Sequence, residues 1–215
     1  INLAKKNEKM LAEGFMFLHH PQFKKIQNLV KSEELGNIHS VVCRFGIPAL
    51  DEPGFRENVD LCGGAFWDVG SYTVAAAIAL FNDQDVKVLF SEIIKLDDLS
   101  VDTMGRAILK FSQGTIAYLE WGVGVAYKNE IDLWAENGSF YTDKLFSKPE
   151  NYFPIYRVRD KYGEETILNG EKAEQFEEMF RVFSEISNSP AKIEEEYKRI
   201  YKRAKVMDEI VKLSQ

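Results

Sequence analysis

The chain contains the segment Gly63-Gly64-Ala65-Phe66-Trp67-Asp68-Val69-Gly70-Ser71-Tyr72, which combines a glycine pair, an acid and a phenol. The apolar residues that continue to position 81 predict a buried helix here. Asp68 and Tyr72 are four residues apart and are expected on one face of that helix. Such a pair is either hydrogen-bonded in the core or part of a site in which Tyr72 donates a proton beside Asp68. The residues alone leave both interpretations open.

The composition indicates a globular protein with one large domain. Of its 215 residues, 45% are hydrophobic and 28% are charged, and the net charge is −7. This acidic balance disfavours binding to nucleic acid or to an anionic membrane surface. No apolar run is long enough to span a bilayer, and we expect a cytoplasmic protein. Cys43 and Cys62 have no metal-type spacing and no disulfide framework, so both are expected to be small buried residues.

The N-terminal third mixes helix and strand signals around one long loop. Residues 1–7 have the pattern of a helix end, and residues 9–17 are expected to form a strand, which suggests that a domain part precedes them. A helix is predicted from Pro21 to a stop at Gly36, followed by a strand over residues 40–45. The loop over residues 46–63 places Arg56 and Asn58 before the glycine pair, and its length suggests a function.

The rest of the chain predicts an α+β class with an open, predominantly antiparallel sheet and helices packed on one face. Strands are expected over residues 86–94, 102–111, 115–123, 129–135, 139–142, 155–159 and 165–168. Turn signals at Ser112-Gln113-Gly114 and Asn137-Gly138 indicate hairpins and hence antiparallel pairing. Apolar stripes over residues 173–186 and 193–211 predict two helices that face the core.

The strand region also carries four aromatic residues whose orientation decides their role. If several point away from the helices, they form an exposed patch of the kind that marks an interface. A place in the core is the equally weighted alternative. These residues are Tyr118, Trp121, Tyr127 and Trp134.

Several motifs are missing from the sequence. No glycine-rich phosphate loop lies between a strand and a helix, because Gly122 and Gly124 fall inside a strand pattern. There is no HExxH motif and no nucleophile elbow. His19 and His20 are adjacent, point in different directions and have no third ligand nearby, so no metal site is expected.

Three segments in order resemble motifs of the glucose–fructose oxidoreductase, inositol dehydrogenase and MocA family. They are EGFMFLHHPQ at residues 13–22, LGNI at residues 35–38 and CGGAFWDVGSY at residues 62–72, the last similar to the signature GGG-x-x-x-D-x-G-x-(Y/H). The resemblance implies the second domain of a Rossmann-type dehydrogenase. Residues 1–12 would be the tail of a missing nucleotide-binding domain and residues 13–215 the substrate-binding and oligomerisation domain. The last helix, residues 192–213, can pack back toward the missing domain.

The same resemblance implies an NAD(P)-dependent oxidoreductase that acts on a sugar, polyol or related hydroxyl or ketone compound. Tyr72 and Asp68 take the catalytic roles, and Gly63 and Gly64 lie near the nicotinamide. The residues expected to contact substrate are His20, Arg56, Asn58 and Phe17. NAD or NADP is implied for the full-length protein, and no cofactor is expected on this chain alone, which should be inactive. A homodimer or higher oligomer is implied through the open sheet face.

Departures from the family pattern keep a second hypothesis open. Cys62 stands where a glycine is usual, Leu18 where many members have arginine, and Trp67 where a smaller residue is usual. The lysine that lowers the pKa of the family's tyrosine is absent, and a free phenol with a pKa of about 10 is a poor acid–base group at neutral pH. The alternative is therefore a non-catalytic sugar-binding or dimerisation scaffold that retains the fold.

Overall fold

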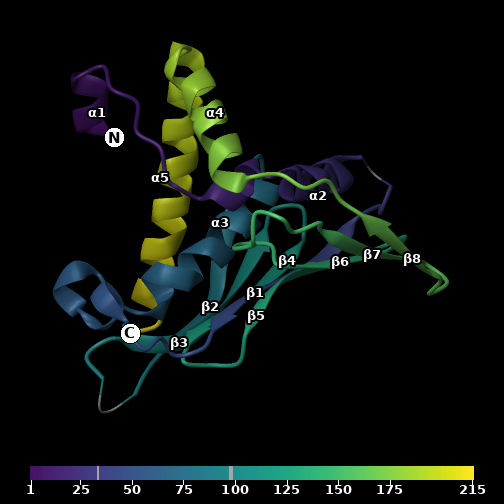
Figure 1. Ribbon diagram of the computed structural model, residues 1–215, viewed down its shortest axis with the longest axis horizontal. Helices are drawn as coiled ribbons and strands as arrows, with labels where there is room; N and C mark the ends of the chain where they lie inside the picture. Colours follow the sequence, from purple (N-terminus) through teal and green to yellow (C-terminus); the bar gives the residue numbers. More distant parts are fainter. Residues whose placement is uncertain (33, 97–98) are drawn as a thin grey trace.

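An eight-stranded sheet with helices on one of its faces forms the body of the protein (Figure 1). The computed structural model describes residues 1–32, 34–96 and 99–215. In this part of the chain the strand order is β2-β3-β4-β1-β5-β6-β7-β8, and all neighbours are antiparallel except the parallel pair of β1 and β4. The predicted α+β class with an open, predominantly antiparallel sheet is confirmed.

Every strand predicted between residues 40 and 168 is present, with ends that differ by at most two residues. The turn at Gly114, where φ is +101°, joins two antiparallel strands, and a second hairpin turns just before Gly138. Both hairpins were signalled locally by turn residues. The strands are β1 Ile38–Ile47, β2 Val86–Lys95, β3 Asp102–Phe111, β4 Ile116–Val123, β5 Lys128–Ala135, β6 Gly138–Asp143, β7 Ile155–Asp160 and β8 Glu165–Asn169.

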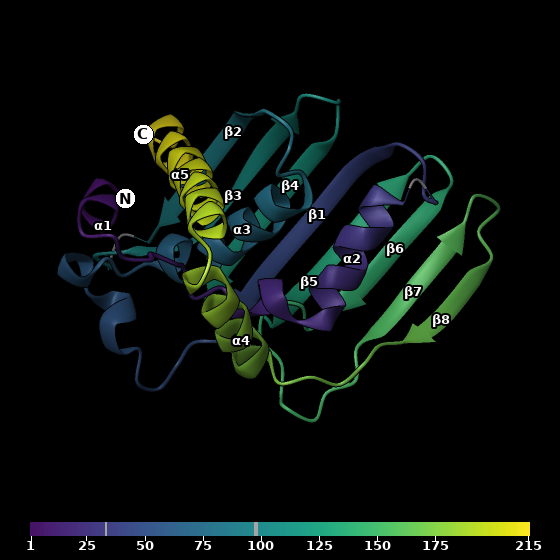
Figure 2. The ribbon, with the colours of Figure 1, turned by 90° about the horizontal axis from the view of Figure 1, so that it is seen from above.

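The helices cover one end and the middle of the sheet and leave the other end bare. Seen from above, α2 (Pro21–Lys31), α3 (Ser71–Leu80) and α5 (Pro190–Leu213) lie over the strands, whereas β7 and β8 extend beyond them (Figure 2). The main contacts of α4 (Gln175–Ser187) are with α5 and with the 3-10 turn η1 (Met16–His19). The short helix α1 (Asn2–Lys6) stands beside α5, where Lys5 Nζ lies 2.6 Å from a carboxylate oxygen of Glu194.

The core lies between the sheet and the helices. Along β1, Val41, Cys43 and Phe45 face the helices and are buried, while the residues between them are partly exposed. Nearly all of α3 is buried as well, which explains why its sequence is apolar on every side. Burial on one face only is typical of an antiparallel sheet whose second face meets water or a partner.

Three local predictions were wrong. Residues 9–17 form no strand: the buried side chains of Met16 and Phe17 belong to η1, so their apolar run reflects the packing of a single turn. Helix α2 ends at Lys31 rather than at Gly36, which instead adopts a φ of +67° in the turn that follows. Cys43 is buried as expected, but Cys62 is exposed and adopts a φ of +56°.

The two C-terminal helices are present, but their apolar stripes are only partly buried. In α4, Met179 and Ile186 are buried, whereas Phe176 and Phe180 are 46% and 63% exposed. The reason is that α4 packs mainly on η1 and α5 rather than on the sheet. In α5, Tyr201 and Leu213 are exposed, and the buried apolar residues are Tyr197, Ile200, Val206, Met207 and Ile210.

Candidate active site

The glycine pair forms a tight turn against the long loop that precedes it. The Gly63 N–H donates to the carbonyl of Asn58 and the Gly64 N–H to that of Arg56, both over 2.8 Å. A Cβ atom on Gly63 would collide with backbone carbonyl oxygens of the loop, and Gly64 adopts a φ of +112°. Glycine is therefore required at both positions by close backbone approach and by conformation.

The segment after the glycines is a π turn, not the regular α-helix that the sequence predicts. The turn η4 spans Phe66–Gly70, and α3 begins only at Ser71. A Cβ atom on Gly70 would press into the ring of Trp121, so the chain lies close to β4 at this point. Single π turns within helices occur frequently at functional sites. The wider turn carries Asp68, whose N–H donates to the Gly64 carbonyl over 3.2 Å.

Arg56 and Asp68 form an ion pair at this turn. Arg56 Nε donates to Asp68 Oδ2 over 2.6 Å, and the two side chains are 31% and 16% exposed. The guanidinium also lies over the ring of Phe55, 4.8 Å from its centroid. A charge-assisted hydrogen bond of this length fixes both side chains, and it directs the Oδ2 atom of Asp68 toward the loop that carries Arg56. The long loop thus places Arg56 against Asp68.

Tyr72 stands in a cage of phenylalanine rings with only part of its side chain exposed. The ring centroids of Phe15, Phe17, Phe45 and Phe146 lie between 5.1 and 6.2 Å from its own. Its hydroxyl oxygen is 3.8 Å from the sulfur of Met16, a weak acceptor. Burial and, secondly, the negative charge of Asp68 raise the pKa of the phenol, while Arg56 acts in the opposite direction. Tyr72 is therefore protonated at neutral pH.

The structure does not expose the other predicted substrate residues beside Tyr72, although the ring of Phe17 stacks on it. His20 is fully buried, its Nδ1 accepts the Gln22 N–H at the start of α2, and burial lowers its pKa to about 4. Phe17 is also fully buried, behind Tyr72. Asn58 is exposed, but its side chain accepts the Asp60 N–H and shapes the loop. A direct contact of His20 or Phe17 with substrate would require either residue to move.

Two cavities adjoin the turn that carries Asp68. One of about 390 Å³ lies between the long loop and the start of β3, and its lining includes Arg56, Gly64 and Asp102 among mostly apolar side chains. The other, of about 420 Å³, lies between the turn and α5 and is lined in part by Trp67 and Ser71. Asp102 also accepts a backbone hydrogen bond from the turn, and no sequence motif pointed to it.

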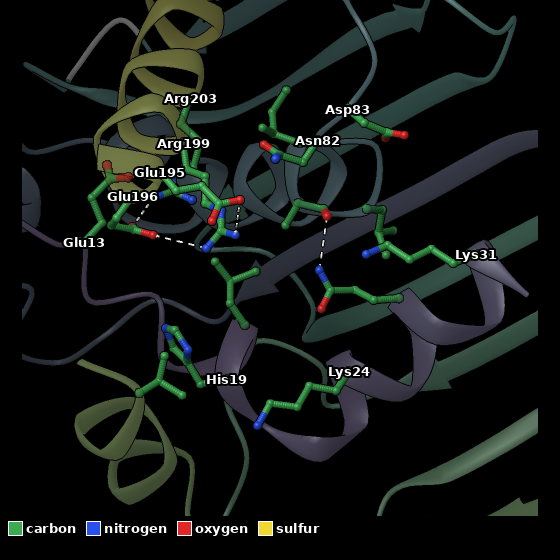
Figure 3. Close-up of a pocket in the computed structure, with 16 residues that line it drawn as sticks. Glu13, His19, Lys24, Lys31, Asn82, Asp83, Glu195, Glu196, Arg199 and Arg203 are labelled. Carbon is green, nitrogen blue, oxygen red and sulfur yellow. Dashed lines mark hydrogen bonds and ion pairs between the residues drawn. The ribbon is translucent and has the colours of Figure 1, made fainter. Parts of the chain in front are cut away.

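A third cavity of about 470 Å³ lies in the helix layer, and its lining includes many charged side chains (Figure 3). The buried guanidinium of Arg203 on α5 bonds to Glu13 over 2.5 Å and to Glu196 over 3.3 Å. This arrangement ties the segment before η1 to the last helix. His19 lines the same cavity, and burial followed by the charge of Lys24 lowers its pKa to about 4. The opposite charges of the lining partly neutralise one another.

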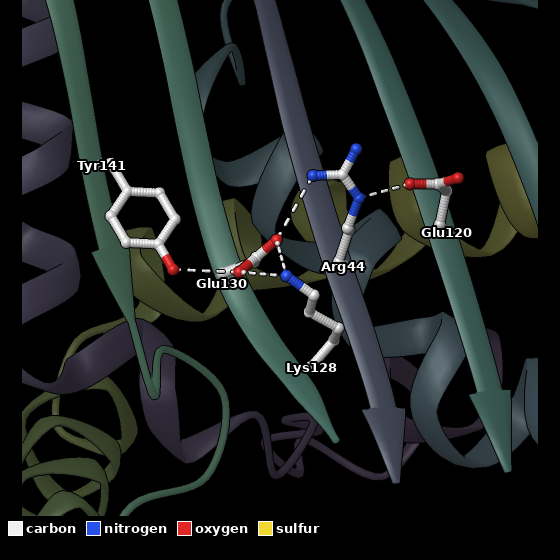
Figure 4. A network of polar contacts seen from close by, with 5 residues as sticks. All are labelled: Arg44, Glu120, Lys128, Glu130 and Tyr141. Atoms are coloured by element: carbon white, nitrogen blue, oxygen red, sulfur yellow. Dashed lines mark hydrogen bonds and ion pairs between the residues drawn. The ribbon is translucent and has the colours of Figure 1, made fainter. Parts of the chain in front are cut away.

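The open face of the sheet carries its own polar network (Figure 4). Glu130, 6% exposed, accepts hydrogen bonds from Arg44, Lys128 and Tyr141 over 2.9 to 3.2 Å. Arg44 also bonds to Glu120 over 2.5 Å. Burial opposes ionisation of Glu130, but these hydrogen bonds outweigh it and hold its pKa below the usual value.

The orientation of the four aromatic residues is divided. Tyr118, Tyr127 and Trp134 are 42%, 52% and 64% exposed, whereas Trp121 is buried against η4. Tyr118 and Trp134 lie on the open face, next to the network around Glu130. Exposed aromatic groups beside a satisfied polar network are typical of an interaction surface.

Two kinds of feature are absent from the described residues. Residues 1–32, 34–96 and 99–215 contain no cluster of three or more side chains able to hold a metal ion. Within the same residues, no helix combines the length and the apolar character needed to cross a bilayer.

Comparison with known families identifies the domain. The family model described as the GFO/IDH/MocA C-terminal domain matches residues 23–141, which contain the glycine turn, Asp68 and Tyr72. The chain belongs to the GFO/IDH/MocA family. This match confirms the family that the sequence motifs indicated.

Several curated relatives are named as oxidoreductases of sugars. A dTDP-3,4-didehydro-2,6-dideoxy-alpha-D-glucose 3-reductase from Actinomadura kijaniata is 30% identical over 184 residues, which are 85% of this chain and 54% of that enzyme. A D-xylose 1-dehydrogenase (NADP(+)) from Haloferax volcanii is 33% identical over 111 residues, 51% of this chain and 33% of its own length. The chain thus spans about half the length of the reductases that it matches.

Solved structures of the GFO/IDH/MocA family show the same fold. KijD10, a 3-ketoreductase from Actinomadura kijaniata in complex with NADP and TDP-benzene, superimposes with a TM-score of 0.89 at 26% identity. The superposition covers 99% of this chain and 65% of KijD10.

Proposed function

We propose that this chain is the substrate-binding domain of an NAD(P)-dependent oxidoreductase that acts on a ketone or hydroxyl group of a sugar, polyol or related compound. The observation that carries the proposal is the geometry of the π turn. It holds Asp68 in an ion pair with Arg56, four residues before the partly exposed phenol of Tyr72. This turn lies inside the segment that matches the family. The sugar reductases and dehydrogenases among the relatives support the substrate class.

Each group of the turn has a distinct proposed role. A tyrosine with a raised pKa holds its proton at neutral pH, and Tyr72 can therefore donate it to the carbonyl oxygen of a ketone during reduction. Asp68, fixed by Arg56, accepts a hydrogen bond from a substrate hydroxyl and orients the sugar. The surrounding phenylalanine rings limit the access of water to the reacting group.

The cofactor proposed for the full-length protein is NAD or NADP. KijD10 was solved with NADP, and the xylose dehydrogenase is named for NADP(+). In this chain the bare α-carbons of Gly63 and Gly64 face the loop carbonyls and Asp102, so the two glycines shape the turn and offer no cradle for a nicotinamide. A bound nicotinamide supplies the hydride, and we propose that its binding residues belong to the part of the relatives' length that this chain does not match.

The proposed division of the chain assigns residues 1–12 to a nucleotide-binding domain and residues 13–215 to the substrate domain. The separate position of α1, which meets α5 through Lys5 and Glu194, supports this division. It also supports the proposal that residues 192–213 pack toward that domain. We propose that the chain by itself is inactive, because the residues that bind the nicotinamide are proposed to lie in the nucleotide-binding domain.

Replacement of the phenol tests the proposed reaction. In the full-length enzyme, Tyr72→Phe removes the proton donor and is expected to lower kcat by about 100-fold or more, because general acid catalysis contributes 10²–10⁴-fold. The measurement is nicotinamide oxidation at 340 nm with sugar ketones. Tyr162→Phe, at a side chain that is 81% exposed on the β7–β8 turn, is the matched control and should keep full activity. An unchanged kcat in Tyr72→Phe would reject the assignment.

We also propose that the open face of the sheet pairs with a second copy of the chain. The face presents exposed apolar side chains at alternating strand positions, among them Phe90, Met104, Tyr118 and Trp134. Its charges are of both signs, as in the network around Glu130, and a twofold interface requires such self-complementarity. Sedimentation velocity of the purified protein is expected to show a dimer, and a monomer at high concentration would contradict the proposal.

A further inference from the structure

Asp102, the first residue of β3, reaches the π turn from a distant part of the sequence. Its Oδ2 atom accepts the Phe66 N–H over 2.7 Å. The residue that precedes the turn, Ala65, has no side chain that can cap it. The first N–H groups of a helical segment have no partner within it, and a carboxylate is well suited to satisfy them. A strand of the rigid sheet therefore anchors the start of the site helix.

Gly64 connects this anchor to the predicted active-site residues. A Cβ atom on Gly64 would overlap the Asp102 carboxylate, so the absence of a side chain at Gly64 makes room for that group. The Gly64 N–H donates to Arg56, and its carbonyl accepts the N–H of Asp68. One residue thus links Asp102 to both members of the Arg56–Asp68 ion pair.

The surroundings of Asp102 hold it in place. Burial raises the pKa of its carboxyl group, while the N–H groups of Phe66 and Ala65 stabilise the ionised form. The neighbouring Ser100 hydroxyl donates to the Glu57 carbonyl over 3.1 Å, which fastens the start of β3 to the loop that carries Arg56. Asp102 is therefore a fixed contact between the sheet and the turn.

We propose that Asp102 is a positioning residue of the active site, whose carboxylate sets the π turn and thereby the orientation of Asp68 toward Arg56. This inference rests on the proposed function for its effect on turnover. Its structural part concerns the turn alone and can be tested separately.

The kinetic test compares three substitutions in the full-length enzyme. Asp102→Ala removes the acceptor and is expected to lower kcat about tenfold, the effect of one lost hydrogen bond. Asp102→Asn keeps an acceptor oxygen in the same place and should restore kcat to within about threefold of the native value. Asp102→Glu keeps the charge but displaces it toward Gly64, and should lose about as much activity as the alanine variant. Full activity of Asp102→Glu would show that the charge alone matters and would overturn the positioning role.

Asp160 provides the matched control. Its Oδ1 atom accepts the N–H groups of Tyr162 and Glu164 at the β7–β8 turn, so it makes the same kind of contact away from the site. Asp160→Ala is expected to lower the melting temperature but to leave kcat unchanged. If Asp102→Ala and Asp160→Ala lost kcat equally, the effect of Asp102 would come from lower overall stability. That result would refute the inference.

Amide hydrogen exchange separates this inference from the proposed function. In the 215-residue chain, Asp102→Ala is expected to accelerate exchange of the Phe66 and Asp68 N–H groups at least tenfold, with Asp102→Asn close to the native rate. If exchange is unaltered, the positioning role is wrong whatever the activity. If exchange accelerates but the native full-length enzyme reduces no sugar ketone, the proposed function fails and the structural role of Asp102 stands.

Discussion

The two faces of the central sheet differ sharply, and β5 shows the difference within a single strand. Ile131 and Leu133 point to the helices and are fully buried, whereas Asp132 and Trp134 between and beyond them are exposed on the opposite face. The covered face gains stability by removing hydrocarbon from water. The open face instead combines a satisfied charge network with exposed aromatic groups. The first face maintains the fold, and the second is suited to association.

The largest expected effect comes from the covered face. Leu133→Ala leaves a cavity among helix-facing side chains and is expected to lower the free energy of unfolding by about 3 kcal/mol, within the range of about 2–5 kcal/mol for such changes. Urea unfolding monitored by circular dichroism measures it. Its neighbour Trp134→Ala serves as the internal control. If both variants lost the same free energy of unfolding, the covered face would not contribute more to stability than the open face.

An intermediate effect is expected from the buried carboxylate of the open face. Glu130→Gln weakens the charge-assisted hydrogen bonds to Arg44, Lys128 and Tyr141. It should lower the free energy of unfolding by about 1–3 kcal/mol at pH 7. The pKa of Glu130 lies below its usual value of 4.5, so its contribution is complete above that pH and is lost as the pH falls through the folded-state pKa. The difference in the free energy of unfolding between the native protein and Glu130→Gln should therefore become smaller at acidic pH.

A pH series of urea titrations tests this dependence, with Glu92→Gln as the control. Glu92 pairs with Arg106 over 2.6 Å on the same face, but its side chain is 43% exposed. Exposed ion pairs contribute about 0–1 kcal/mol, so little change is expected. A constant difference between native protein and Glu130→Gln from pH 7 to pH 3 would contradict the role assigned to the charge.

The smallest effect on the stability of a single copy is expected for Trp134→Ala. The side chain is 64% exposed, and substitutions of such surface residues change the free energy of unfolding by about 0.5 kcal/mol or less. Self-association should weaken by about tenfold or more, because exposed aromatic residues often dominate interface energetics. Sedimentation velocity over a concentration series measures it, with Tyr162→Ala as the control. Unaltered association would argue against the proposed pairing through this face.

Most of the fold was predictable because its signals are local. The hairpin turns at Gly114 and Gly138 and the prolines at the starts of α2 and α5 mark element boundaries directly. The expected strand at residues 9–17 failed because a short apolar run does not distinguish a strand from a single buried turn. Exposure of Phe176 and Phe180 was also unpredictable, since it depends on where α4 lies relative to the sheet.

The contacts of the candidate site were predictable only where its residues belong to a motif or to the loop before it. Asp68, Tyr72 and Arg56 come from one continuous region, and the structure brings Arg56 and Asp68 together. The contribution of Asp102 depends on a contact across the fold that no local pattern announces. The π turn was missed for a related reason: the apolar spacing of residues 66–81 suits either helix type.

The single parallel pairing among the described strands has a consequence for how the chain must fold. Strands β2 to β4 and strands β5 to β8 each form a ribbon in which successive strands pair antiparallel. Among the strands that the structure describes, β1 alone joins the two ribbons, lying between β4 and β5 although it precedes both in the sequence. That insertion brings together segments distant in sequence and is expected to be a slow step. A chain lacking residues 38–47 would keep two separate ribbons and no common platform for the site.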